Sequence, residues 1–234
     1  MGFIVFAIVV IAADILLGVS LIATFVTILA LFCLVELRSL SNGRVGPAAY
    51  RAVGVQALVA LLAVATVWVA DLVHDNLPLV VAAVAVPAMV QNMAAYYIGR
   101  FWLTRQDSSK SLLARLLGWH HFKHSPRKTF GVTIASSAIA LAVGVACFFA
   151  SPLLLSIAAV SAIFAAVGDL TESRLKRLTK VTDSGEKLRK GRSLFAALER
   201  TISSHGGFLD RFDSLFFCAA LALVPVLMFI PQGG

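Results

Sequence analysis

The chain has 234 residues, of which 59% are hydrophobic and 14% are charged, and its mean hydropathy is +0.91. Soluble domains are about 45–50% apolar and about 25% charged, so this composition excludes an ordinary soluble domain and indicates a membrane protein. The formal net charge is +8, which favours anionic lipid headgroups or phosphorylated substrates as partners. We expect no nucleic acid partner, because no nucleic-acid-binding motif accompanies the charge.

Six or seven stretches are long and apolar enough to cross a hydrocarbon core, which takes about 20 residues as a helix. In chain order they are 21–35 with an apolar lead-in at 3–17, then 52–70, 77–98, 129–150, 153–167 and 215–230. The first 36 residues form either a hairpin of two helices or one helix with an interfacial lead-in. The expected fold class is an all-α integral membrane protein with six or seven transmembrane helices.

The positive charges indicate the topology. All 20 Lys and Arg lie in three segments, with three between 38 and 51, seven between 100 and 128, and ten between 174 and 211. The alternate connections, around 71–76 and 151–152, carry none. By the positive-inside rule the three charged segments face the cytoplasm, including the loops 100–128 and 169–212.

A polar stripe continues the apolar stretch 153–167. Asp169, Glu172, Ser173, Lys176 and Arg177 stand at positions i, i+3, i+4, i+7 and i+8, which places them on one face of a helix. Carboxylates, a hydroxyl and cations on one face are groups that can hold a metal ion and a phosphate. The alternative is an amphipathic helix end with ion pairs between successive turns.

A second polar cluster, SHGGFLDRFDS, precedes the last apolar stretch. If the last helix begins near Phe208, Asp210 and Asp213 project from one side of its first turn. Two carboxylates held this close favour a cation between them, and Asp169 can complete such a site. Two kinds of residue flank these acids. The glycines allow close backbone approach, and the other side chains donate hydrogen bonds: Gly206 and Gly207, then His205 and Arg211. The alternative is an acidic first helical turn after a glycine-rich loop.

These residues belong to a longer ordered pattern. It runs Ser173-Arg-Leu-Lys176-Arg177, then Thr182-Asp183, then His205-Gly-Gly-Phe-Leu-Asp210-Arg211-Phe-Asp213. Upstream stand Asn92-Met-Ala-Ala-Tyr96-Tyr-Ile-Gly99-Arg100 and Ser125-Pro-Arg-Lys128-Thr129. The whole pattern resembles the phosphatidate cytidylyltransferases, also called CDP-diacylglycerol synthases, over about residues 80–232.

The resemblance implies a reaction in which CTP and phosphatidate give CDP-diacylglycerol and pyrophosphate. It further implies Mg²⁺, with a second monovalent or divalent cation left open, a homodimer, and a site facing the cytoplasm in a bacterial inner membrane. The implied metal ligands are Asp169, Asp210 and Asp213, and the implied catalytic residues are Lys176, Arg177, His205 and Asp210. The implied substrate-binding residues are Ser125, Lys128, Thr129, Ser173, Glu172, Asp183, Gly206, Gly207, Arg211 and Asn92. Residues 1–80 would then be N-terminal transmembrane helices and residues 81–234 the catalytic transmembrane region.

The chain departs from the family pattern at several places. Asn92 stands where the family usually has Asp, Thr182 replaces a lysine, and residues 186–204 form an insert. We expect Lys187–Ser203 to form a short amphipathic helix at the membrane surface. Two alternatives stay open: a related CTP-using enzyme acting on another phosphorylated or isoprenoid lipid, and a homologue that binds lipid without catalysis.

Overall fold

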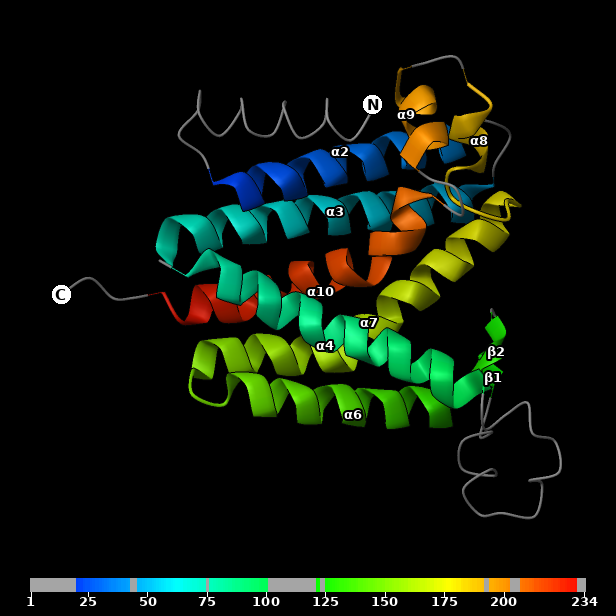
Figure 1. The fold of residues 1–234 in the computed structure, drawn as a ribbon. Coiled ribbons are helices and arrows are strands. Elements are labelled where there is room, and N and C mark those ends of the chain that lie inside the picture. The colour runs from blue at the N-terminus through cyan, green and yellow to red at the C-terminus, as the bar shows by residue number, and fades with distance from the viewer. Residues whose placement is uncertain are drawn as a thin grey trace, which may run out of the picture.

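The computed structural model describes residues 20–42, 46–74, 76–100, 121–122, 125–191, 194–202 and 207–230. Its long helices are α2 (Leu21–Ser41), α3 (Pro47–Val73), α4 (Leu77–Ile98), α6 (Phe130–Phe148), α7 (Pro152–Thr179) and α10 (Phe208–Met228). Two short helices, α8 (Glu186–Arg189) and α9 (Leu194–Ile202), connect α7 to α10. A two-stranded antiparallel ribbon, β1 (His121–Phe122) and β2 (Ser125–Thr129), precedes α6 (Figure 1).

All six long helices are long and apolar enough to cross a membrane. The predicted fold class is confirmed, with the small ribbon as an addition to the helices. The observed α4 has the bounds predicted for it, 77–98. Whether the first 19 residues add a seventh helix lies outside the described residues.

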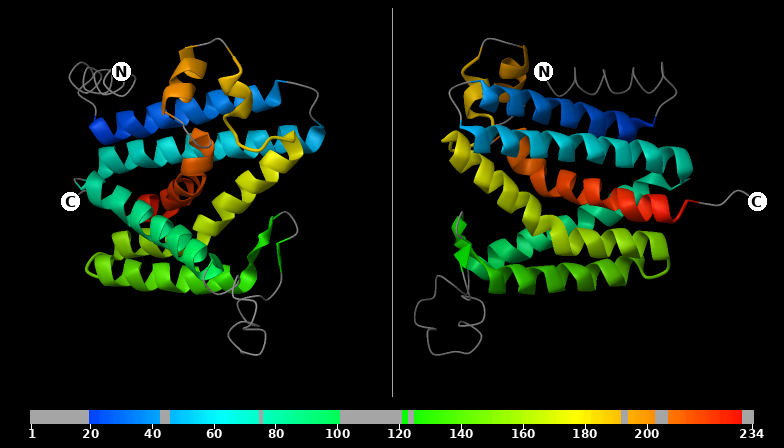
Figure 2. Two further views of the ribbon diagram at one scale, coloured as in Figure 1. Left: turned by 45° about the vertical axis from the view of Figure 1, so that its right-hand side comes forward. Right: turned by 180° about the vertical axis from the view of Figure 1, so that it is seen from behind.

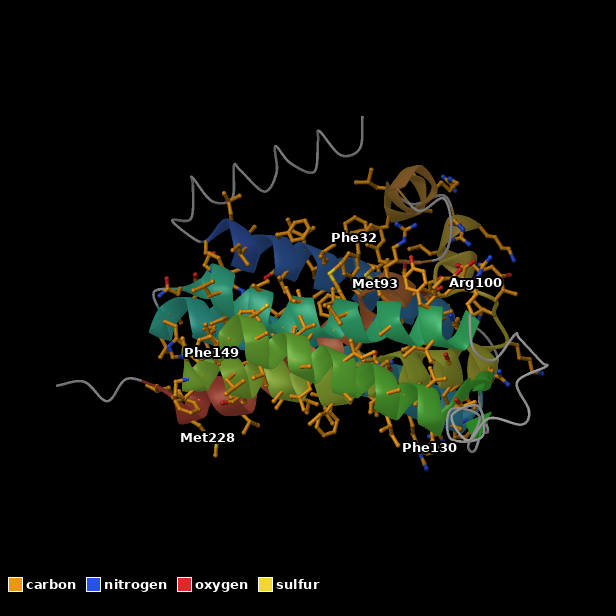
Figure 3. All side chains as sticks on the ribbon, turned by 60° about the horizontal axis from the view of Figure 1, so that its bottom comes forward. Phe32, Met93, Arg100, Phe130, Phe149 and Met228 are labelled. Carbon is orange, nitrogen blue, oxygen red and sulfur yellow. The ribbon has the colours of Figure 1, made fainter. Side chains whose placement is uncertain are left out.

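The surface of the helical bundle is apolar along its flanks. Large hydrophobic side chains in the middle of the helices are about half exposed, among them Leu61 of α3, Ile139 of α6 and Ile163 of α7. Figure 3 shows Phe149 and Met228 at one end of the bundle and Arg100 at the other, with most nitrogen and oxygen atoms near Arg100. An apolar flank between two ends is what a surface in contact with lipid requires. The chain is an integral membrane protein.

Helix α10 lies at the centre of the arrangement, in contact with α2, α3, α4 and α7. α2 and α3 lie side by side on one side of it, while α6 and the first half of α7 lie together on the other (Figure 2). The ends of α2, α4 and α7 and the starts of α3 and α6 gather at one end of the bundle (Figure 1). The described parts of the three charged segments therefore meet there, and the compartment which that end faces stays a prediction.

Two helices extend well beyond the apolar stretches that predicted them. α7 continues past the apolar stretch 153–167 and through the polar stripe, as its helical spacing predicted, and it ends at Thr179, where Lys180 adopts a left-handed conformation with φ of 56°. α10 begins at Phe208, before the apolar stretch that starts at 215, so the predicted start near Phe208 is confirmed. Each helix thus carries its polar residues in continuous register with its membrane span.

Candidate active site

α7 and α10 cross where Gly168 lies against Asp213 and Ser214. A Cβ placed at Gly168 would lie 2.7 Å from the Cα of Ser214 and 2.8 Å from the backbone oxygen of Asp213. Only a residue without a side chain allows the two backbones to approach this closely. The crossing brings Asp169, the next residue of α7, beside Asp213 of α10. The sequence analysis did not identify Gly168.

Three carboxylates meet at this crossing. Asp169, Glu172 and Asp213 each place an oxygen atom so that all three atoms lie within 4.8 Å of one another. Glu172 is 2% exposed and Asp213 is 6% exposed, and like charges this close and this buried are costly unless a cation lies between them. Carboxylate oxygens are the ligands that Mg²⁺ prefers. The donor set therefore fits a divalent cation, which would be held by two predicted metal ligands together with Glu172. The sequence analysis placed Glu172 among the substrate-binding residues.

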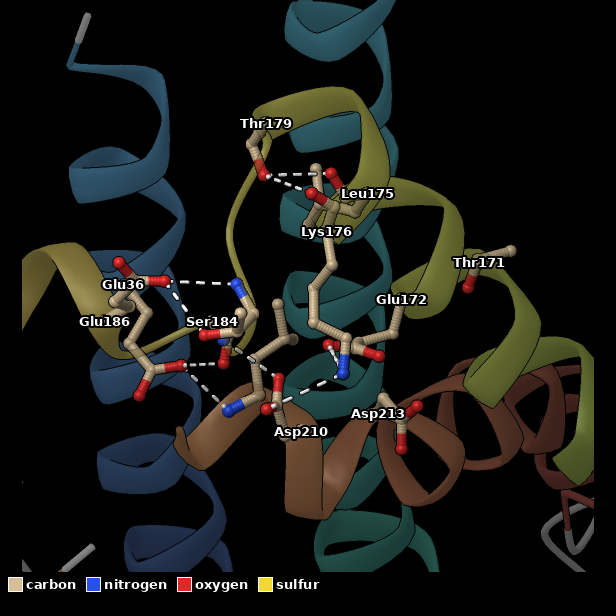
Figure 4. Close-up of polar contacts among 12 residues, drawn as sticks. Glu36, Thr171, Glu172, Leu175, Lys176, Thr179, Ser184, Glu186, Asp210 and Asp213 are labelled. Atoms are coloured by element: carbon tan, nitrogen blue, oxygen red, sulfur yellow. Dashed lines mark hydrogen bonds and ion pairs between the residues drawn. The ribbon is translucent and has the colours of Figure 1, made fainter. Parts of the chain in front are cut away.

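Lys176 lies beside this group and links it to Asp210 (Figure 4). Its Nζ is 2.9 Å from Oε1 of Glu172 and 3.7 Å from Oδ2 of Asp210. Asp210 also accepts a hydrogen bond from the backbone N–H of Ser184, at 3.1 Å. Among the described residues Asp210 is not part of the three-carboxylate group. Its predicted role as a metal ligand stays a prediction, and the contacts that it makes are with Lys176 and Ser184.

A fifth acid, Glu36 on α2, holds the start of α10. It is fully buried, and its two carboxylate oxygens accept the backbone N–H of Phe208 at 2.6 Å and that of Leu209 at 2.9 Å. Oε2 also accepts the hydroxyl of Ser184 at 2.9 Å (Figure 4). The first N–H groups of a helix have no partner within the helix and carry its positive dipole end, so a carboxylate stabilises them. The sequence analysis missed Glu36, although a lone acid after an apolar run is a signal of a functional or structural role.

Gly207 packs against the loop that follows α7. A Cβ at this position would lie 2.5 Å from the backbone nitrogen of Gly185 and 2.8 Å from Oε2 of Glu36, and closer still to the hydroxyl of Ser184. The sequence analysis placed Gly207 among the implied substrate-binding residues. In the structure the close neighbours of Gly207 belong to the protein, and they account for the absence of a side chain.

The loop after α7 is held by its own ion pairs. Asp183, a predicted substrate-binding residue, pairs with Arg189 of α8. Glu186 accepts the backbone N–H and the hydroxyl of Thr182, both at 3.0 Å, and pairs with Lys190 at 2.9 Å. The Thr182 backbone N–H, followed by Lys190 and the Thr182 hydroxyl, lowers the pKa of Glu186 to about 2. Thr182 therefore has a structural partner in this chain, where the family pattern has a lysine.

In place of the single helix predicted over Lys187–Ser203, the described part of the insert has two short helices, α8 and α9, and each of them contacts α2. Nζ of Lys187 donates to the backbone oxygen of Leu40 near the end of α2, at 3.1 Å. The ring of Phe195 meets that of Phe32 edge-on, with the ring centres 5.3 Å apart. Leu194 is 73% exposed. A location of α9 at the membrane surface stays a prediction.

The other predicted site residues have diverse surroundings. Thr129 is buried, and its hydroxyl caps α6 by accepting the N–H of Val132 at 3.3 Å. Asn92 is exposed on α4, Arg177 on α7 and Arg211 on α10, and Ser173 is half-buried. Only the backbone is described for Ser125 and Lys128, which lie in β2. His205 and Gly206 lie outside the described residues.

A family model described as "Cytidylyltransferase family" matches residues 107–229, which is more than half of the chain. The chain belongs to the cytidylyltransferase family. This confirms the family indicated by the sequence pattern. The matched segment contains α7 and α10 with all the carboxylates at their crossing, whereas Glu36 lies upstream of it.

Curated relatives in this family carry the name phosphatidate cytidylyltransferase. The protein of Staphylococcus haemolyticus is 34% identical over 135 residues, which cover 54% of this chain and 45% of that protein. Those of Staphylococcus saprophyticus and Staphylococcus epidermidis are 36% and 35% identical, with the same coverage. The chain spans about half the length of these relatives. No solved structure matches the chain.

Proposed function

We propose that the chain transfers the cytidylyl group of CTP to phosphatidate, giving CDP-diacylglycerol and pyrophosphate. The observation that carries this proposal is the group of three carboxylates, Asp169, Glu172 and Asp213, beside Lys176 at the crossing of α7 and α10. The group lies within the segment that matches the cytidylyltransferase family. The names of the relatives support phosphatidate as the acceptor.

The reaction needs positioning and charge neutralisation rather than a covalent nucleophile. An oxygen of the lipid phosphate attacks the α-phosphorus of CTP and forms a new P–O bond. The bond between the α-phosphorus and the oxygen that bridges it to the β-phosphorus breaks, and pyrophosphate leaves. A divalent cation bound by the three carboxylates supplies positive charge to the phosphate oxygens and to the leaving pyrophosphate. Lys176 lies close enough to the carboxylates to contact a phosphate bound there, and Arg177, on the same side of α7, is exposed to reach one.

The place of the site suits two substrates of opposite solubility. Its carboxylates stand on helices that also span the membrane, near the end of the bundle where the positive segments gather. A lipid phosphate at the membrane surface can reach this position without leaving the bilayer, while CTP approaches from water. We propose that this end faces the cytoplasm of a bacterial inner membrane, because CTP is cytoplasmic and the charged segments follow the positive-inside rule. The homodimer implied by the family resemblance stays part of the proposal.

The deciding experiment follows both products of one reaction. Purified protein in detergent micelles with Mg²⁺ receives α-labelled CTP and phosphatidate, and lipid-linked label and pyrophosphate are measured together. Equal amounts of CDP-diacylglycerol and pyrophosphate are expected. In a parallel reaction with an isoprenoid alcohol in place of phosphatidate, release of CDP together with phosphorylation of the alcohol would instead identify a CTP-dependent lipid kinase. Lipid binding with neither product would identify a non-catalytic homologue.

A further inference from the structure

A pocket lies between α3 and α7, on the other side of α7 from the carboxylates. It has a volume of about 230 Å³, and its polar lining comes from Arg51, Gln56, Thr171 and Arg174. Arg174 stands two residues from both Glu172 and Lys176, and at about 3.6 residues per turn it projects from the opposite side of α7. The pocket is therefore separate from the proposed catalytic site.

The floor of this pocket is ordered by hydrogen bonds between the two helices. Gln56 of α3 is 3% exposed, and its Nε2 donates to Oγ1 of Thr171 on α7 at 2.9 Å. The Thr171 hydroxyl in turn donates to the backbone oxygen of Gly168 at 2.7 Å. Small side chains, Ala48 and Ala52, complete the wall on α3. The cavity is thus part of the packing of α3 on α7.

The charge of the pocket is positive. Arg51 and Arg174 are both exposed, and no carboxylate of the described residues forms an ion pair with either guanidinium. Arg51 lies just after the first turn of α3, and this first turn contains no acidic residue. The positive dipole end of α3 adds to the charge of both arginines. An anion bound in this pocket would be stabilised by both arginines and by the positive dipole end of α3.

The surroundings of the pocket favour a lipid as the source of that anion. α3 begins and α7 ends at the same end of the bundle (Figure 1). Because both helices are long and apolar enough to span a membrane, we place this end at the edge of the hydrocarbon layer. Val55 and Leu58 follow Arg51 at i+4 and i+7 on one face of α3, and they are 52% and 56% exposed. An apolar strip thus runs from the arginines along the flank of the bundle, in the direction that an acyl chain would take.

We propose that the pocket between α3 and α7 binds the phosphate of an anionic phospholipid, as a site distinct from the catalytic one. The two guanidinium groups match the geometry of phosphate oxygens and hold them by charge-assisted hydrogen bonds. Lipid headgroups, inorganic phosphate and nucleotides all contain a phosphate group that these arginines could bind. The strip formed by Val55 and Leu58 selects the lipid.

Binding is tested with short-chain phosphatidylglycerol and without CTP, so that the result does not depend on catalysis. Dioctanoyl phosphatidylglycerol is titrated into the protein in neutral detergent, and the apparent Kd is taken from the rise in melting temperature. The variant Arg51→Gln/Arg174→Gln is expected to raise this Kd by about tenfold or more, because it removes both charge-assisted contacts. Arg38→Gln is the matched control, since Arg38 is an exposed arginine in the last turn of α2 and does not line the pocket.

Each outcome decides the proposal. Phosphatidylglycerol binding that depends on Arg51 and Arg174, with no comparable effect of dioctanoyl phosphatidylcholine, supports it. Unchanged binding by the double variant overturns it, as does equal stabilisation by inorganic phosphate, which would make this a soluble-anion site. A change in oligomeric mass in the double variant would assign the arginines to a protein interface instead.

If the double variant does not fold, the two single variants carry the same test. Arginine-dependent lipid binding in a chain without cytidylyltransferase activity would leave this inference standing while refuting the proposed function.

Discussion

The carboxylate of Glu36 accepts a hydrogen bond from the backbone N–H of Phe208 at 2.6 Å, across 172 positions of the chain. Phe208 is the first residue of α10, the helix that carries Asp210 and Asp213. Glu36 also holds Ser184, whose backbone N–H contacts Asp210. One buried acid on α2 therefore fixes both the start of α10 and the loop that packs on it.

Substitution of Glu36 by Gln should weaken both the fold and the site. The amide keeps one acceptor, but it loses the negative charge and turns an NH₂ group toward backbone donors. Since hydrogen bonds to charged groups contribute about 1.5–3 kcal/mol each, we expect a loss of about 1–3 kcal/mol in stability and a clear fall in turnover. Thermal unfolding in detergent and CTP turnover measure the two effects. Glu186→Gln is the comparison for a glutamate that does not contact α10, and it should lower the melting temperature only slightly. Unchanged melting and turnover in Glu36→Gln would show that Glu36 does not position the site.

Alanine at the two tightly packed glycines should be costly. Gly168→Ala would push α7 away from α10, and Gly207→Ala would push the start of α10 from the Ser184 loop. Overpacking of this kind costs about 1–3 kcal/mol, and both variants should melt at lower temperature. Gly54→Ala is the matched control, because a Cβ there meets no described atom within 4 Å and alanine favours the helix by up to about 1 kcal/mol. A similar melting temperature for all three variants would contradict the close crossing.

Substitutions of the acids at the helix crossing should differ in how they change the Mg²⁺ dependence of the activity. Asp169→Asn and Asp213→Asn each remove a charge from the three-carboxylate group. We expect the half-saturating Mg²⁺ concentration to rise by about tenfold or more in both, with the fold intact because repulsion is relieved. Asp210→Asn should lower turnover with a smaller change in Mg²⁺ dependence, because Asp210 contacts Lys176 and Ser184. Equal shifts for Asp210→Asn and Asp213→Asn would make Asp210 a ligand as well.

Alanine substitutions of the neighbours Lys176 and Arg177 should lower turnover to different extents. Lys176 lies between Glu172 and Asp210, where we propose that a phosphate binds, whereas Arg177 is exposed. Lys176→Ala should lower turnover by about 10²-fold, the usual scale for losing one charged group at a phosphoryl site, with little change in Mg²⁺ dependence. Arg177→Ala should have a smaller effect. Steady-state kinetics at saturating Mg²⁺ compare the two, and a reversed order would exchange their roles.

The loop after α7 should lose stability in acid through Glu186. Its pKa of about 2 lies below the ordinary value of 4.5, so its contacts with Thr182 and Lys190 stabilise the fold above about pH 4.5 and are lost as the pH falls toward 2. The melting temperature of the wild type should therefore exceed that of Glu186→Gln at pH 7. The difference should be small, because the group is partly exposed to solvent, and should shrink below about pH 4.5. A difference that is constant from pH 7 to pH 3 would refute this account.

The sequence by itself determined the elements and their polar faces. Apolar length predicted the membrane helices, because about 20 apolar residues are needed to span a bilayer wherever they occur. The helical period placed Asp169, Glu172 and Lys176 on one face, and the observed α7 is continuous through all of them. The start of α10 at Phe208 was also predicted, since these properties depend on residues close together in the chain.

The tertiary structure alone decided which polar groups meet. The register of α7 on α10 depends on the missing side chain of Gly168, and it placed Glu172 with Asp169 and Asp213 while leaving Asp210 with Lys176. Glu36 joined the network from a helix 172 positions away, where no local periodicity relates it to α10. Helical periodicity is a property of one segment, whereas the contact between two segments is fixed by how their surfaces pack, and only the folded chain contains that information.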